Sequence, residues 1–215
     1  MRFLDKVPLF AGLPRADLDR LAALATTRTF PRRAHIVREG ERSDALYVVL
    51  YGRLKVYVSG TAGDEVILGM VRAGDCFGEM ALIDDASCSA TVTTLEPTRL
   101  AIIAKGSFKQ CLAARPEMAL NLLKALNQRV RLLTGNVKSF ALLDVAGRLA
   151  RTLTALAVPH GDGFIVEQRV THQELANMVG SSREMVTRAL KDLVRHGYIS
   201  IERRHIVVHP SMPRE

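Results

Sequence analysis

An apolar seam in the second half of the 215-residue chain constrains the fold more than any other feature. Apolar residues recur at steps of four and three, at positions 119, 123, 126, 130, 133, 137 and 140. This spacing keeps one stripe along a long helix for about three heptads. A helix packed on its own domain is the alternative. The length and regularity of the seam favour a parallel dimer helix, with Arg129, Arg131 and Lys138 off the seam.

The chain changes character on either side of this seam. Residues 30–103 alternate between apolar and polar side chains and are punctuated by glycines, which predicts short strands of an antiparallel barrel or sandwich. Residues 1–29 predict short helix and turn. After Asp144 the pattern predicts a helix to Ala157, a turn at 159–163, a strand at 164–170, two short helices and a hairpin at 199–208. That order of elements is typical of a winged helix.

The two short helices are predicted from their capping residues. Thr171 and Glu174 have the spacing of a capping box, so a helix is expected to begin there. Gly180 suits the left-handed residue that ends a helix. Ser181 and Ser182 can cap the second helix, whose buried side is expected to hold Val186, Leu190 and Leu193.

The opposite face of the second helix predicts contacts with DNA bases. Arg183 and Arg188 can each donate two hydrogen bonds to guanine, and Glu184 can accept one from cytosine. The alternative makes the arginines solvated charges and Glu184 the capping partner of Ser181. Two helices, a glycine turn and a wing with Arg203 and Arg204 at its tip favour DNA binding. The predicted contacts are Arg183, Glu184, Arg188, Thr187, Ser182, Gln173, His172 and Arg204.

Composition narrows the function classes. A net charge of +8 and a pI near 9.8 favour an anionic partner. Three cysteines without a Cys-x-x-Cys pair argue against a disulfide framework or a structural zinc site. No secretory leader or spanning run is visible, so a cytoplasmic protein without membrane contact is expected. We find no catalytic set of nucleophile and base and no metal-ligand spacing, so neither an enzyme nor a metal protein is expected.

Four stretches of the sequence resemble the catabolite activator and fumarate-nitrate regulator superfamily of bacterial transcription regulators. They are residues 173–188 in the DNA-binding motif, residues 44–56 and 74–82 in its cyclic-nucleotide-binding β-roll, and residues 144–148 in the hinge after its dimer helix. The resemblance implies an α+β fold with a jelly-roll-like antiparallel β-roll sensor at 1–115, a dimerisation helix at 116–143 and a winged helix-turn-helix at 144–215. It also implies a homodimer on a palindromic TGTGA-like site in double-stranded promoter DNA, and RNA polymerase as partner of an activator.

The same resemblance implies an effector site inside the β-roll. Its expected residues are Gly78, Glu79, Met80, Ala81, Cys88, Ser89, Leu133 and Thr134. Members that bind cyclic AMP have an Arg where this chain has Cys88, and a hydroxyl residue where it has Leu133. A neutral thiol does not replace a charge-assisted phosphate contact. Cyclic AMP is therefore disfavoured, and cyclic di-GMP or a ligand-independent active state are alternatives. The Gly78-Glu79 turn is retained either for a phosphate or for the barrel itself.

The sequence also bears on other sensor types of the superfamily and on one other function class. Iron-sulfur members have an N-terminal cysteine cluster, whereas no cysteine precedes Cys76 here, so no cluster is expected. Cys76 without a located partner is weak evidence for haem, and a small buried residue is the preferred interpretation. The rival function is a cyclic-nucleotide-binding module that acts through protein contacts and has a degenerate DNA domain. The adjacent Arg183 and Glu184, together with Arg188, argue against it.

Overall fold

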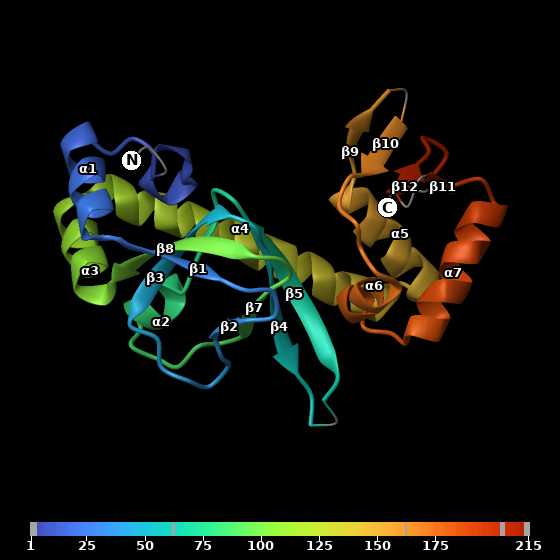
Figure 1. Cartoon of the computed structure of the whole chain (residues 1–215). Helices are drawn as coiled ribbons and strands as arrows, with labels where there is room; N and C mark the ends of the chain where they lie inside the picture. The colour runs from blue at the N-terminus through green and yellow to red at the C-terminus, as the bar shows by residue number, and fades with distance from the viewer. Residues whose placement is uncertain (1–3, 62, 162, 203–204, 213–215) are drawn as a thin grey trace. The chain divides into compact units, whose positions relative to one another are not determined.

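The computed structural model of the protein describes residues 4–61, 63–161, 163–202 and 205–212 (Figure 1). The chain forms two compact units, one from residues 1–58 and 67–132 and the other from residues 59–66 and 133–215. The division between them falls within the longest helix. The three-part domain division with boundaries at residues 115 and 143 stays a prediction.

Two four-stranded sheets lie in the first unit, apart from residue 59 at the end of β4 and residues 65–66 at the start of β5. The first sheet has, in spatial order, β1 (Thr26–Phe30), β8 (Thr98–Ala104), β3 (Ala45–Tyr51) and β6 (Cys76–Phe77). The second has β2 (His35–Val37), β7 (Thr91–Thr94), β4 (Arg53–Ser59) and β5 (Glu65–Arg72). The strand pairs β1–β8, β3–β8, β3–β6, β2–β7 and β4–β7 are antiparallel. The predicted antiparallel β architecture is confirmed.

Strand alternation gives the first sheet two buried faces. Leu46 and Val48 of β3 join one apolar cluster with residues of the helices, whereas Val49 joins the cluster shared with the second sheet. Leu100 of β8 likewise lies in the cluster between the sheets, and Ala101 lies in the other. Successive strand side chains point to opposite faces, so a strand with apolar residues at both parities needs cover on both sides.

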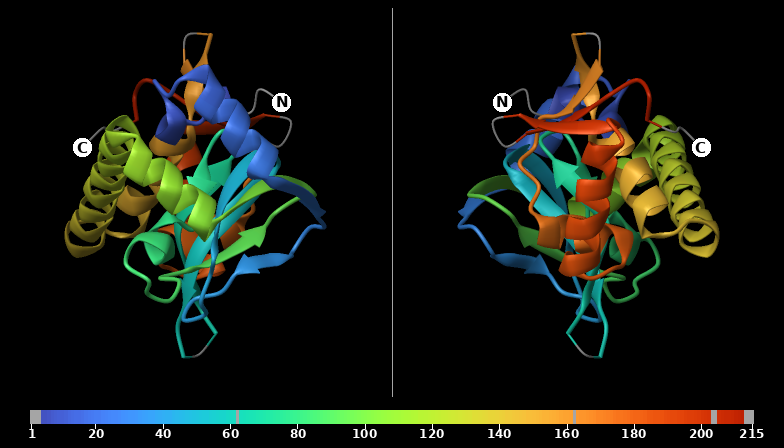
Figure 2. Two further views of the ribbon diagram at one scale, coloured as in Figure 1. Left: turned by 90° about the vertical axis from the view of Figure 1, so that its left-hand side faces the viewer. Right: turned by 90° about the vertical axis from the view of Figure 1, so that its right-hand side faces the viewer.

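Helices cover one face of the first sheet. The helical segments of this unit are η1 (Leu4–Lys6), η2 (Pro8–Phe10), α1 (Arg15–Leu24), α2 (Glu79–Ile83), α3 (Lys105–Ala114) and the first part of α4 (Pro116–Leu142). The left-hand view of Figure 2 shows α1, in blue, beside α3, in green. Arg115, just after α3, pairs with Asp17 of α1 at 2.6 Å. Met118 and Leu122 of α4 are buried in the same apolar cluster, so the start of α4 is anchored on this sheet.

The second unit is a winged helix. It contains α5 (Val145–Leu156), β9 (Val158–His160), β10 (Gly163–Val166), α6 (His172–Val179), α7 (Arg183–Arg195), β11 (Ile199–Glu202) and β12 (His205–Val208). The sheet order is β11-β12-β10-β9 and every pairing is antiparallel. The predicted α+β fold class is therefore confirmed in both units.

The region before α6 corrects one sequence-based prediction. Residues 159–163 were expected to form only a turn, but Val158–His160 forms strand β9 and pairs with β10. The predicted strand at 164–170 ends at Val166. Proline has no N–H to donate to a ladder and is tolerated on edge strands. Pro159 therefore fits β9, which lies at the edge of its sheet.

Candidate functional site

The first helix of the helix-turn-helix begins at the predicted capping box. The Thr171 hydroxyl accepts a hydrogen bond from the Glu174 backbone N–H at 3.1 Å, and the Glu174 carboxylate accepts one from the Thr171 backbone N–H at 2.7 Å. These two bonds satisfy N–H groups that have no partner within the helix. The start of α6 is thereby fixed, and Leu175, Ala176 and Val179 are buried in the core of the unit as predicted.

The turn between the two helices requires glycine. Gly180 ends α6 with φ +58°, the left-handed conformation in which side chains other than glycine are strained. A Cβ atom at this position would lie 2.7 Å from Cε1 of Phe140. Ser182 then caps α7, since its hydroxyl accepts a hydrogen bond from the Met185 backbone N–H at 3.2 Å. Ser182, and not Ser181, is the cap, so Glu184 does not have the N3 role considered from the sequence.

Helix α7 separates a buried face from an exposed one. Its buried residues are Val186, Ala189, Leu190 and Leu193. Arg183, Glu184 and Arg188 are exposed, and in the described part of the chain neither arginine belongs to an ion pair. The two guanidinium groups therefore remain available to an external acceptor.

Three other predicted DNA contacts are engaged within the motif. The Thr187 hydroxyl donates to the Arg183 carbonyl at 2.8 Å and lies 2.9 Å from Nδ1 of His172. Because that hydroxyl proton is already used, Nδ1 of His172 is the donor of the second bond. Gln173 donates to the Asn177 side chain at 2.8 Å. The bond between His172 and Thr187 joins α6 to α7, whereas the other two lie within one helix each. The predicted wing contact Arg204 lies outside the described residues, as does Arg203.

A small cavity in the first unit gathers most of the predicted effector residues. It has a volume of about 60 Å³. Its lining includes six predicted residues, Gly78, Glu79, Met80, Ala81, Cys88 and Ser89. The other lining residues are Val37, Val56, Phe77, Ala90, Val92 and Arg129. Leu133 and Thr134 belong to the second unit and are not part of this lining.

The backbone at Gly78 shapes one wall of this cavity. Gly78 has φ +92°, and a Cβ atom there would lie 2.8 Å from the Ala45 carbonyl oxygen. Both the conformation and the close approach to β3 require glycine. The barrel therefore accounts for Gly78 by itself, so the glycine alone is no evidence for a phosphate.

Glu79 and Cys88, which both line the cavity, have pKa values raised by burial. Burial raises the pKa of the Glu79 carboxyl, while its own backbone N–H and the positive charge of Arg129 lower it by less. Burial also raises the pKa of the Cys88 thiol, and the charge of Glu41 adds to this. Burial raises the pKa of Cys76 to about 12. The thiols at 76 and 88 are therefore neutral near pH 7, and neither supplies a charge to a ligand.

Arg129 is the lining residue that the sequence analysis missed. The sequence analysis placed it off the dimer seam and gave it no further role, whereas in the structure it is half-buried and lines the cavity. The sequence signal that could have found it is a second apolar stripe on the same helix. Met118, Leu122 and Leu126, four residues apart, pack on the apolar cluster of the first unit, and position 129 follows three residues later. That spacing continues the inward face of the helix.

We expect Glu79→Gln to stabilise the protein at pH 8. The raised pKa means that the folded state binds this proton more tightly than the unfolded state, so Glu79 costs stability as pH rises from its unfolded pKa through its folded pKa. Each unit of that difference corresponds to about 1.4 kcal/mol. Urea denaturation should show the gain of the variant at pH 8 and a smaller gain at pH 5. A variant less stable than wild type at pH 8 would contradict this assignment.

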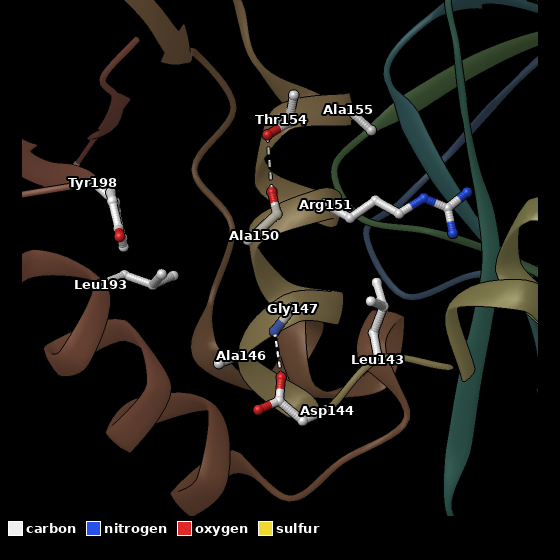
Figure 3. A pocket seen from close by; sticks show the side chains of 10 residues that line it. All are labelled: Leu143, Asp144, Ala146, Gly147, Ala150, Arg151, Thr154, Ala155, Leu193 and Tyr198. Atoms are coloured by element: carbon white, nitrogen blue, oxygen red, sulfur yellow. Dashed lines mark hydrogen bonds between the residues drawn. The ribbon is translucent and has the colours of Figure 1, made fainter. Parts of the chain in front are cut away.

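A larger hollow of about 570 Å³ lies in the second unit along α5 (Figure 3). Its lining is mainly apolar and consists of Leu143, Asp144, Ala146, Gly147, Ala150, Arg151, Thr154, Ala155, Leu193 and Tyr198. The charged groups in it already have partners. Asp144 caps α5 by accepting from the Gly147 N–H at 2.8 Å, and Arg151 donates to the Gly135 carbonyl. Ligand sites need polar groups that converge on the ligand, so the smaller cavity is the better candidate.

The described residues contain neither a candidate membrane-spanning helix nor a candidate metal site. No helix there combines the length and the apolar character needed to cross a membrane. No group of three or more His, Cys, Asp or Glu side chains in these ranges is placed to hold a metal ion.

Two family models match different parts of the chain. Residues 27–115 match the family described as cyclic nucleotide-binding domain, and residues 147–211 match the Crp-like helix-turn-helix domain. The cAMP-activated global transcriptional regulator CRP of Pasteurella multocida is 34% identical over 186 residues, which cover 84% of this chain and 88% of that protein. The CRP-like cAMP-activated global transcriptional regulator of Mycobacterium tuberculosis is 29% identical over 212 residues, 97% of this chain and 95% of that protein.

A solved structure agrees with these matches. The c-di-GMP responsive global regulator CLP of Xanthomonas campestris superimposes with a TM-score of 0.78 at 28% identity, covering 92% of this chain and all of that one. The sequence matches, the fold and the helix-turn-helix geometry all indicate the same family. The chain belongs to the catabolite activator and fumarate-nitrate regulator superfamily of DNA-binding transcription regulators.

Proposed function

We propose that this protein is a homodimeric transcription regulator that recognises a palindromic TGTGA-like site and is controlled by a nucleotide in the cavity beside Glu79. The observation that carries the proposal is the N-terminal end of α7, where Arg183 and Glu184 are exposed above a buried face. A recognition helix presents its N-terminal residues to base edges in the major groove.

The exposed seam of α4 supports the dimer. Five seam residues are solvent-accessible in the single chain: Leu123 (58%), Val130 (59%), Leu133 (36%), Val137 (67%) and Phe140 (44%). A long contiguous apolar stripe on a helix surface is the mark of a partner helix. A two-fold dimer holds two recognition helices, which accounts for a palindromic site.

A nucleotide is the effector class that both the lining and the relatives support. The relative from Pasteurella multocida is named as cAMP-activated, and the regulator from Xanthomonas campestris as c-di-GMP responsive. Cys88 replaces the arginine of cyclic-AMP-binding members, so we place cyclic AMP below cyclic di-GMP as the physiological effector. A form active without ligand remains the alternative. Promoter DNA, the second copy and, for an activator, RNA polymerase are the proposed partners in the cytoplasm. We propose no catalytic activity.

A gel-shift assay tests the DNA proposal. A duplex with two TGTGA half-sites in inverted orientation is compared with a duplex of the same composition in which both half-sites are scrambled, with and without nucleotides. We expect a shift of the palindrome at protein concentrations that leave the scrambled duplex free. Equal affinity for the two duplexes would favour the module that acts through protein contacts.

We expect Cys88→Arg to increase the affinity for cyclic AMP by roughly 10- to 150-fold, because a charge-assisted contact contributes about 1.5 to 3 kcal/mol. Calorimetry of both proteins measures the change. Ser87→Arg is the matched control, since it adds the same charge to an exposed neighbour outside the cavity lining. Tight binding by the wild type that Cys88→Arg leaves unimproved would show that another group holds the phosphate.

A further inference from the structure

Met185 is an exposed apolar side chain on the helix that is proposed to enter the major groove. It is the third residue of α7, and 41% of its surface is accessible. The buried face of α7 does not include it. Met178, by contrast, packs against the apolar cluster of the second unit. Packing in the core of the unit therefore does not account for a methionine at position 185.

The helical position of Met185 sets its neighbours. Residues three and four positions apart lie next to each other on a helix surface. Arg188 is three positions after Met185 and four after Glu184, so these side chains are neighbours. Glu184 and Arg188 are proposed readers of base edges. Met185 thus lies beside Arg188 in the first turn of α7, the part of a recognition helix that reaches the bases.

The backbone at Met185 is fixed independently of its side chain. The Met185 N–H donates to the Ser182 hydroxyl at 3.2 Å, and this bond caps the helix. A backbone donor is present whichever of the ordinary residues other than proline stands at this position. A substitution at 185 therefore changes the surface of α7 without removing its cap.

The charged neighbours of Met185 suit hydrogen-bonding groups, whereas Met185 suits a methyl group. Thymine carries a C5 methyl group in the major groove, and apolar side chains contact it there. The methionine side chain is flexible and polarisable, so it adapts to such a group. A TGTGA half-site presents thymine methyl groups at its first and third positions and opposite its final adenine. The proposed site therefore offers a partner of the right chemistry.

We propose that Met185 determines part of the sequence specificity by contacting the C5 methyl group of a thymine in each half-site. The inference rests on the proposed recognition of a TGTGA-like site and adds an apolar contact to the charged readers. It accounts for a large apolar side chain exposed on the turn that is proposed to face DNA. It also predicts that the protein distinguishes thymine from uracil, a difference that lies in the methyl group alone.

Replacement of thymine by deoxyuridine tests this contact, because it removes the methyl group and keeps every hydrogen-bonding group of the base. Each duplex with two TGTGA half-sites carries deoxyuridine at one thymine position, the same in both half-sites. Fluorescence anisotropy measures the affinity of the full chain. We expect one position to weaken wild-type binding by roughly 15-fold, from about fourfold for each methyl group. Met185→Ala should bind that duplex within about twofold of the unmodified one.

Two control variants separate the methyl contact from general effects. Val194→Ala removes an equally exposed apolar side chain, at 41%, from the other end of α7 and should keep the full uracil effect. Met185→Leu keeps an apolar side chain and should keep most of that effect. Because each variant is compared with wild type on the same two duplexes, a change in DNA stiffness caused by uracil cancels. A uracil effect that persists in Met185→Ala, or that no thymine position shows in wild type, would overturn the inference.

A duplex with scrambled half-sites distinguishes this inference from the proposed function. A wild-type chain that prefers the palindrome but shows no uracil effect dependent on Met185 overturns the role of Met185 and leaves recognition of the site standing. A chain that binds the palindromic and scrambled duplexes equally overturns the proposed function, and the inference falls with it.

Discussion

Val130→Asp is expected to convert the protein to monomers and to weaken its binding to palindromic DNA. Val130 is 59% exposed in the single chain and lies seven residues from both Leu123 and Val137 on the seam. In the proposed dimer this position would be buried, and an unpaired carboxylate there would cost several kcal/mol. Two symmetry-related Asp residues would also repel each other. Because each 1.4 kcal/mol is a factor of ten, the dimer dissociation constant should rise more than about a hundredfold.

Sedimentation velocity measures this change, and the choice of variant matters. Leu126→Asp is a poorer test, since Leu126 packs on the apolar cluster of the first unit and its substitution would also damage that core. Gln128→Asp is the matched control because it adds the same charge to an exposed position of α4 away from the seam. An unchanged dimer for Val130→Asp would place the interface elsewhere.

Local signals predicted much of the DNA-binding unit. Thr171 and Glu174 are three positions apart, so the capping role of their side chains at the start of α6 can be predicted from the sequence. The glycine at 180 is explained in the same way by its positive φ. Such features depend on a few neighbouring residues and not on the tertiary fold. The long apolar seam could also be predicted from the sequence, since its period is a property of one helix.

Features that depend on distant pairing were not predicted. Strand β9 exists because Val158–His160 finds a partner in β10, and three residues that include a proline give no strand signal alone. The place of Arg129 in the cavity lining was not predicted for a related reason. Its sequence neighbours suggest a solvated helix face, and only the packing of Met118 and Leu122 on the β-roll shows that the same face turns inward. The helix thus carries two neighbouring stripes, one packed on the core of the first unit and one exposed as the seam.

Arg183→Ala is expected to weaken binding to the preferred site by about 1 to 3 kcal/mol and to relax the preference at one guanine in each half-site. Arg183 is the first residue of α7, is exposed and is free of ion pairs among the described residues. A guanidinium in that position can donate to O6 and N7 of guanine in the major groove, whereas alanine offers nothing to distinguish the base pairs. Selection from randomised DNA, followed by sequencing, measures the preference at every position.

The control for this variant lies at the other end of the same helix. Arg195 pairs with Asp192 at 3.0 Å and is 74% exposed, so Arg195→Ala removes an equal charge far from the N-terminal turn and should leave the selected motif unchanged. A phosphate contact would behave in a third way, since its loss weakens all sequences alike and reduces the salt dependence of binding; that is the sequence-based expectation for Arg204→Ala. Recovery of the same motif by wild type and Arg183→Ala would show that base readout resides in other side chains of α7.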